Sequence, residues 1–268
     1  MKKLFFLTAI VSLLLVGCNN DNGDYDPNDP SRETVRLLPS RISFDGGGGI
    51  DLQYDDLNRL VRLVSWGDTT VITYDANNNP VRMEGNNVAV TFLYEGKQVF
   101  IAGQRWSSLI SDTLTLNANG QVVKRVSWSY NTWDGWRRSS QEEFFYNLTG
   151  NVVRIMENNY HQILYSYSNV RSVFRHVNAP DWFIFSVISL EIRYPSDDCV
   201  PCQTFYHSRI GYMMSSIREQ YRNEGVLNYE LDANGYVVRA TLEWEERLVG
   251  GGTRTERKSW SYEYVLAR

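Results

Sequence analysis

The chain has 268 residues, of which 43% are hydrophobic, and its 27 Lys and Arg against 31 Asp and Glu give a formal net charge of −4. Its arginines are scattered along an acidic chain and form no basic stripe, so we expect no nucleic-acid partner.

The first eighteen residues, MKKLFFLTAIVSLLLVGC, place two lysines before an apolar run. This order is typical of a secretory signal peptide, and the run is too short for a membrane-spanning helix. The ending Leu15-Val16-Gly17-Cys18 resembles the lipobox of bacterial lipoproteins. The resemblance implies that residues 1–17 are removed and that Cys18 becomes lipidated and binds the membrane. The alternative is an ordinary signal peptide followed by an incidental cysteine.

Residues 18–40 are rich in Asn, Asp, Gly and Pro, which indicates a flexible acidic tether rather than folded structure. An acidic run directly after the lipidated cysteine resembles the surface-export signal of Bacteroidetes lipoproteins. It implies an outer-membrane lipoprotein exposed at the cell surface. The alternative is an anchor that faces the periplasm.

A nine-residue phrase recurs along the rest of the chain, with an apolar or Tyr residue, then Asp or Asn, then turn-forming residues, then Val before a basic residue. The copies are YDDLNRLVR (54–62), YDANNNPVR (74–82), LNANGQVVK (116–124), YNLTGNVVR (146–154) and LDANGYVVR (231–239). Asp, Asn and Gly favour turns, and the flanking residues favour strands. Each copy therefore predicts a chain reversal followed by a strand.

Between these reversals lie long β-type runs, including 181–194 and 253–266, whereas 208–221 fits a helix or a strand. Asp134-Gly135 predicts a two-residue hairpin in which Trp133 faces Trp136. The reversals give about fourteen strands, too many for a flat open sheet. We predict an all-β fold over 41–268: an antiparallel up-and-down meander, closed or nearly closed as a barrel.

The recurring phrase resembles the YD repeats of Rhs- and teneurin-type shells, although its spacing here is irregular. The mature chain resembles an uncharacterised family of Bacteroides lipoproteins with a porin-like fold, which implies a barrel and brings no activity or catalytic residue. Segments such as 253–260 and 137–145 put charges on both strand faces, unlike the apolar outer band of a membrane barrel. A lipid-tethered soluble barrel fits this pattern better than a channel.

Cys199 and Cys202, in the segment DDCVPCQTFYH, lie two residues apart in an exported chain. A local disulfide is the favoured hypothesis. A metal or redox centre on Cys199, Cys202 and His207 is a second hypothesis, although two cysteines and one His are an incomplete zinc set. The sequence has no catalytic motif. We therefore expect no enzyme, no cofactor and no resident metal.

The aromatic content is high, with 8 Trp and 17 Tyr, and Trp128, Trp133 and Trp136 cluster around one hairpin. These rings either fill the barrel and pair across strands, which we favour, or form an exposed platform for a glycan or a protein. The sequence predicts a non-catalytic, lipid-anchored envelope protein that acts as a surface binding or scaffold module. A barrel that carries a small apolar ligand is the alternative.

Overall fold

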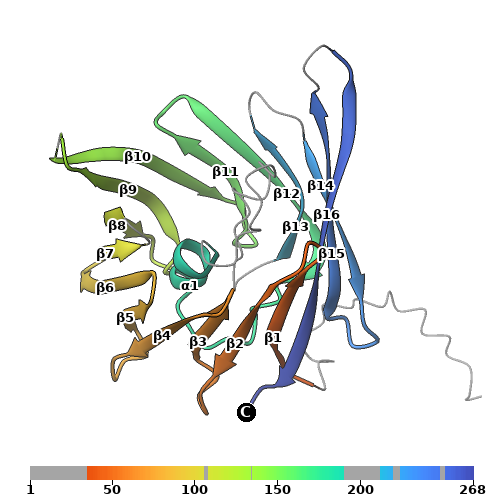
Figure 1. The fold of residues 1–268 in the computed structure, drawn as a ribbon, viewed down its shortest axis with the longest axis horizontal. Coiled ribbons are helices and arrows are strands. Elements are labelled where there is room, and N and C mark those ends of the chain that lie inside the picture. The colour runs from red at the N-terminus through yellow and green to blue at the C-terminus, as the bar shows by residue number, and fades with distance from the viewer. Residues whose placement is uncertain (1–34, 106–107, 134, 190–211, 220–223, 248–250) are drawn as a thin grey trace, which may run out of the picture.

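The protein forms a closed antiparallel β-barrel in the computed structural model (Figure 1). The structure describes residues 35–105, 108–133, 135–189, 212–219, 224–247 and 251–268. Within these ranges the chain makes sixteen strands, each paired with the strands before and after it, and the last strand pairs with the first. The predicted all-β meander is therefore confirmed as a closed barrel.

The first eight strands are β1 (Leu37–Phe44), β2 (Gly49–Tyr54), β3 (Leu60–Ser65), β4 (Asp68–Tyr74), β5 (Pro80–Gly85), β6 (Val88–Glu95), β7 (Gln98–Arg105) and β8 (Ser108–Leu116). The other eight are β9 (Val122–Asn131), β10 (Gly135–Tyr146), β11 (Val152–Glu157), β12 (His161–Arg171), β13 (Tyr212–Glu219), β14 (Gly225–Leu231), β15 (Val237–Arg247) and β16 (Thr253–Leu266). A helical turn, α1 (Asp181–Phe183), and a π-helical turn, η3 (Ile184–Ile188), precede β13. The first strand thus begins inside the range predicted as tether, and 208–221 contains a strand.

The wall of the barrel has one apolar face and one polar face. In β6, for example, Val88, Val90 and Phe92 are buried, whereas Ala89 and Thr91 are exposed. A sheet buried on one side and solvated on the other alternates in this way. The buried residues of all the strands join one hydrophobic core, so the apolar face points into the barrel.

Residues 172–189, here called the plug, follow β12 and enter the barrel, so that α1 lies inside the ring of strands (Figure 1). The ring centroid of Phe183 lies 5.6 Å from that of Phe92 and 6.4 Å from that of Tyr74. Phe185 lies 5.3 Å from Phe144 of β10. Side chains of the wall alone fill only a narrow barrel, and a sixteen-stranded one is much wider. The plug therefore supplies apolar volume that the wall lacks.

The prediction of a β-type run over 181–194 is wrong for its described part, because 181–188 is helical. All eight of these residues, Asp181–Ile188, are buried. Each strand of the wall is already hydrogen-bonded to a strand on either side, so no free strand edge remains with which the plug could pair. Its buried backbone groups are satisfied within the segment, as a helical conformation allows. Periodicity alone does not separate such a short apolar run from a strand.

The recurring phrase forms the same turn in all five places, as the sequence predicted. At Asp55, the side-chain Oδ1 accepts hydrogen bonds from the backbone N–H groups of Leu57 and Arg59, both at 3.0 Å. The backbone N–H of Asp55 donates to the carbonyl of Arg59 at 3.1 Å. Equivalent bonds are made by Asp75, Asn117, Asn147 and Asp232. We call these five reversals the repeat turns.

The valine in the phrase has a defined structural role. In the first repeat, Gln53 pairs with Arg62 but Tyr54 pairs with Leu60, which leaves Val61 as the extra residue of a β-bulge. The same one-residue shift leaves an extra valine in the other four repeats, at positions Val81, Val123, Val153 and Val238. Each phrase therefore encodes a side-chain-capped turn and the bulge that follows it.

A ring of tyrosines lines the inner face near the repeat turns. In seven of the eight even-numbered strands, one tyrosine hydroxyl donates to a backbone carbonyl of the preceding strand at 2.5–2.8 Å. The donors are Tyr54, Tyr74, Tyr94, Tyr146, Tyr167, Tyr229 and Tyr264. Burial raises the pKa of each of these hydroxyls above its ordinary value. The ring ties neighbouring strands together where they meet the plug.

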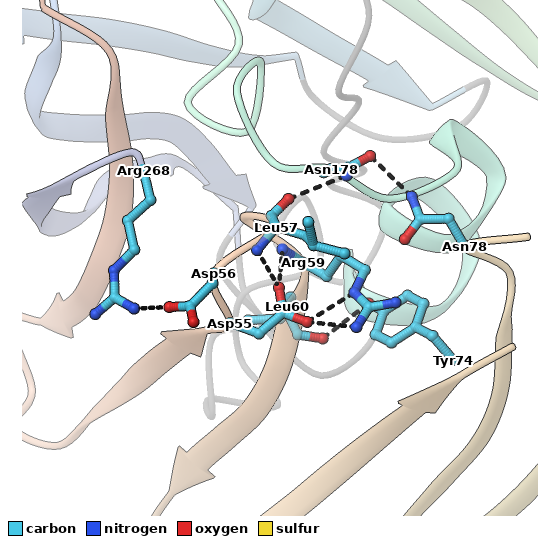
Figure 2. A network of polar contacts seen from close by, with 9 residues as sticks. All are labelled: Asp55, Asp56, Leu57, Arg59, Leu60, Tyr74, Asn78, Asn178 and Arg268. Carbon is cyan, nitrogen blue, oxygen red and sulfur yellow. Dashed lines mark hydrogen bonds and ion pairs between the residues drawn. The ribbon is translucent and has the colours of Figure 1, made fainter. Parts of the chain in front are cut away.

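A polar latch holds the plug to the first two repeat turns (Figure 2). The backbone N–H of Asn178 donates to the carbonyl of Asn58 at 2.9 Å, and its side-chain amide donates to the carbonyl of Leu57 at 3.0 Å. Asn78 Nδ2 donates to Asn178 Oδ1 at 2.8 Å. The Asn58 side chain also exchanges two hydrogen bonds, both of 2.8 Å, with the backbone of Arg268. The latch therefore joins the plug, two turns and the C-terminal residue.

Asn58 and Asn78, the latch residues that belong to repeat turns, occupy a position that glycine fills in the other three turns. The fourth residue of each repeat turn has a positive φ, which is 60° at Asn58 and 68° at Asn78. Gly120, Gly150 and Gly235 take this place in the other three turns. Asn tolerates the left-handed conformation better than most residues, and it adds a side chain that can bond elsewhere. In addition to shaping its turn, Asn58 thus bonds the chain end through its side chain, and Asn78 bonds the plug.

We predict that Asn78→Gly lowers the free energy of unfolding by about 1 kcal/mol, the typical contribution of one hydrogen bond. Glycine keeps the positive φ and removes only the bond to Asn178. Asn77→Ala is the control, because the Asn77 side chain makes no hydrogen bond to the residues that the structure describes, and it should change stability by less than about 0.5 kcal/mol. Urea unfolding measures both variants. If Asn78→Gly lowers the free energy of unfolding as much in an Asn178→Ala background as in the wild type, the two side chains do not stabilise each other, which would contradict the latch.

The tyrosine ring predicts a loss of stability at alkaline pH. A phenol whose pKa is raised by folding stabilises the protein fully below its unfolded pKa of about 10, and this contribution is lost as pH rises further. Unfolding in urea should therefore need progressively less denaturant above about pH 10. Tyr74→Phe should weaken this dependence, because one such group is gone. A fully ionised tyrosine population at pH 11 in the folded protein, measured by absorbance, would contradict the prediction.

Candidate functional site

Strands β9 and β10 carry three aromatic side chains on the outer face of the barrel. Tyr130 and Trp136 lie directly opposite each other in the ladder, and their ring centroids are 5.7 Å apart in an edge-to-face arrangement. Trp128 lies two residues before Tyr130 and therefore on the same face. We call Trp128, Tyr130 and Trp136 the aromatic patch.

This register corrects the prediction that Trp133 faces Trp136. Asn131 pairs with Gly135, so three residues separate the strands instead of two, and the partner of Trp136 is Tyr130. Gly135 has φ of 70°, the left-handed conformation that ends a three-residue hairpin loop. Trp133 lies in the loop itself.

The aromatic patch is open to solvent. Trp128, Tyr130 and Trp136 have exposed fractions of 40%, 43% and 49%, and Trp133 at the hairpin tip reaches 91%. All three tryptophans proposed as a platform are thus exposed, and two of them share one face. Large exposed apolar surfaces of this kind commonly mark sites of interaction.

Two polar side chains border the aromatic patch on β10. Arg138 lies directly opposite Trp128 in the ladder, and its Nη1 donates to Oε1 of Gln141 at 3.3 Å. A shift in register between Arg138 and Ser140 places a β-bulge at this point of the strand. Bulges bend a strand and redirect its side chains. The outer face here therefore combines flat rings with hydrogen-bonding groups.

A buried ion cluster lies on the inner face of the same strands. The Arg125 guanidinium of β9 contacts Asp112 of β8 at 2.7 Å and Glu142 of β10 at 3.7 Å. The three side chains are only 14%, 8% and 15% exposed. A buried charge that loses its partner is costly, so this cluster strongly favours the observed register of β8, β9 and β10. It fixes the strands that carry the aromatic patch.

The remaining aromatic residues divide between the two roles considered for them. Trp182, Trp244 and Trp260 are buried in the core, in addition to the tyrosine ring. The interpretation that rings fill the barrel thus holds for these residues, whereas the rings of the aromatic patch are exposed and their role as a binding platform stays a prediction. A carrier of a small apolar ligand would need room inside the barrel, and the plug occupies part of that interior.

Several predicted site residues lie outside the described residues. These are the lipidation candidate Cys18, the disulfide candidates Cys199 and Cys202, and His207 of the metal or redox hypothesis. Among the residues that the structure does describe, no group of three or more His, Cys, Asp and Glu side chains is arranged to hold a metal ion. No helix in this part of the chain has the length and apolar character needed to cross a membrane.

Comparison with known proteins gives structural matches alone, since no family model and no curated protein matches the chain. The crystal structure of a porin-like protein from Bacteroides uniformis covers 85% of this chain and 98% of its own, with 15% identity and a TM-score of 0.39. A porin-like protein from Bacteroides vulgatus covers 84% and 98%, with 10% identity and a TM-score of 0.38. Likeness at this level transfers no activity to this chain.

Proposed function

We propose that this protein is a non-catalytic, lipid-anchored protein of the outer membrane, exposed at the cell surface, whose barrel presents the aromatic patch to a glycan. The observation that carries the proposal is the exposure of Trp128, Tyr130 and Trp136 on one face of a fixed wall. Exposed rings offer flat apolar surfaces on which the C–H face of a sugar stacks, while polar neighbours bond its hydroxyl groups.

The polarity of the wall supports a tethered barrel over one immersed in lipid. Outer-face positions elsewhere carry charged and polar side chains such as Arg62, Arg82 and Glu84, which are exposed. A barrel embedded in lipid has an apolar outer band instead. The inner face, by contrast, is apolar and packs on the plug. This polarity suits a barrel surrounded by water.

The position of the chain entry supports display of the aromatic patch away from the membrane. The Ala267 N–H donates to the carbonyl of Arg36, and Arg268 bonds to the first repeat turn, so the start of β1 lies at the repeat-turn end. The β9–β10 hairpin is at the other end, because β9 leaves a repeat turn and runs to Asn131. A lipid on Cys18 would hold the repeat-turn end near the membrane and leave the aromatic patch facing outward.

The proposed lipid anchor and surface exposure predict that the protein fractionates with membranes and that protease added to intact cells digests it. In cells, the wild type should fractionate with the outer membrane and be lost on protease treatment of intact cells. Cys18→Ser should abolish membrane retention, because no thioether to lipid can form. A periplasmic marker serves as the control for cell integrity. Protection of the wild type in intact cells would contradict surface exposure, and a membrane-bound Cys18→Ser protein would contradict the lipid anchor.

The aromatic patch predicts glycan binding that depends on its rings. Trp128→Ala and Trp136→Ala should each weaken binding about five- to thirtyfold, since one stacking ring contributes about 1–2 kcal/mol. Leu164→Ala, an exposed apolar truncation on β12 outside the patch, is the matched control. Binding is measured by calorimetry and by glycan array. Equal binding by all three variants would overturn the patch as the binding surface.

A further inference from the structure

The outer face of β9 and β10 places a cation beside the stacking rings. We propose that the glycan bound by the aromatic patch is an acidic one, whose sugar carboxylate pairs with Arg138. This inference rests on the proposed function and adds the chemical class of the ligand. It depends on the position of Arg138, on its present partner and on the charges around it.

The position of Arg138 brings its guanidinium to the edge of the aromatic patch. Arg138 faces Trp128 directly across the β9–β10 ladder, and both side chains are exposed. Side chains opposite each other in an antiparallel pair have Cβ atoms about 5 Å apart. A pyranose ring stacked on Trp128 therefore places its ring substituents within reach of the guanidinium.

The guanidinium has unused capacity for an anion. Its one hydrogen bond among the described residues is the 3.3 Å contact from Nη1 to the neutral amide oxygen of Gln141, and no carboxylate of this part of the chain pairs with it. Arginine carries five N–H donors in a planar fork that matches a carboxylate. Arg82, also on the outer face, pairs with Glu84 at 2.9 Å. Arg138 differs from Arg82 in having an uncharged amide as its partner.

The neighbouring charges leave a local excess of positive charge. Further along the same outer face, Glu143 lies directly opposite Lys124 in the ladder, so these two opposite charges balance each other. Gln141 lies between Glu143 and Arg138 and carries no charge. On a chain with a net charge of −4, the region beside the aromatic patch therefore attracts an anion.

The test is a panel of acidic oligosaccharides, each measured beside its neutral methyl ester. Oligogalacturonate, hyaluronan fragments and sialyllactose serve as probes, with the protein in its full mature form. At least one acid should bind at least about tenfold more tightly than its ester, because a charge-assisted pair with arginine is lost on esterification. Raising the salt concentration should reduce this difference.

Arg138→Gln should abolish the preference for the acid while leaving ester binding within about twofold. Arg62→Gln makes the same chemical change on the outer face of β3, where Arg62 bonds Thr69 at 3.3 Å, and should alter neither ligand. Both arginines are exposed, so both variants should keep the wild-type unfolding temperature.

The outcomes separate the two proposals. Equal binding of acids and esters, or a preference for acids that survives Arg138→Gln, overturns the assignment of the carboxylate site and leaves the glycan-binding function in place. Absence of binding to every acid and every ester overturns both. Binding of acids that is lost in Arg138→Gln and unchanged in Trp128→Ala overturns stacking at the aromatic patch and retains an anion site at Arg138.

Discussion

The interior of a sixteen-stranded barrel has to be filled, and this requirement organises the rest of the molecule. Wall side chains close a narrow barrel by themselves, but a wider one needs additional material or admits water. Here the plug provides that material, with Phe183 contacting Phe92 of β6 and Phe185 contacting Phe144 of β10. The inner face is mainly apolar for this reason, apart from polar groups such as the buried cluster of Arg125, Asp112 and Glu142. The outer face is thus the reverse of a lipid-facing wall.

The turn that recurs along the chain connects the sequence to this architecture. One carboxylate or amide oxygen, such as Oδ1 of Asp55, accepts two backbone N–H groups and fixes the reversal. The valine bulge that follows bends the strand, and the tyrosine ring bonds neighbouring strands at the same end. Because the plug enters at this end, the latch through Asn178 joins two of the repeat turns to the plug.

The sequence predicted the features that depend on residues close together in the chain, and it missed those that depend on contacts between distant segments. Asp, Asn and Gly act on their own backbone, so the repeat turns and the meander followed from residue types alone. The helical conformation of 181–188 did not, since it arises from a wall already paired on both sides. The partner of Trp136 was missed because one residue more in the loop changes the register. The cluster of Trp128, Trp133 and Trp136 was visible in the sequence, but Tyr130 and Arg138 entered the candidate site only through strand pairing.

The aromatic patch bears on function because the fold does not require exposed aromatic side chains at these positions. The rings that fill the barrel lie inside, where burial stabilises them, whereas Trp128 and Trp136 lie exposed on the outer side of the wall. Behind them, Arg125 joins three strands through Asp112 and Glu142, so the surface is held in one geometry before any ligand arrives. A fixed surface loses little conformational freedom on binding, which favours recognition of a flat, hydrated ligand by a few side chains. The stability of the barrel gives no reason for exposed rings and an available guanidinium on such a wall, and the proposed glycan site would use both.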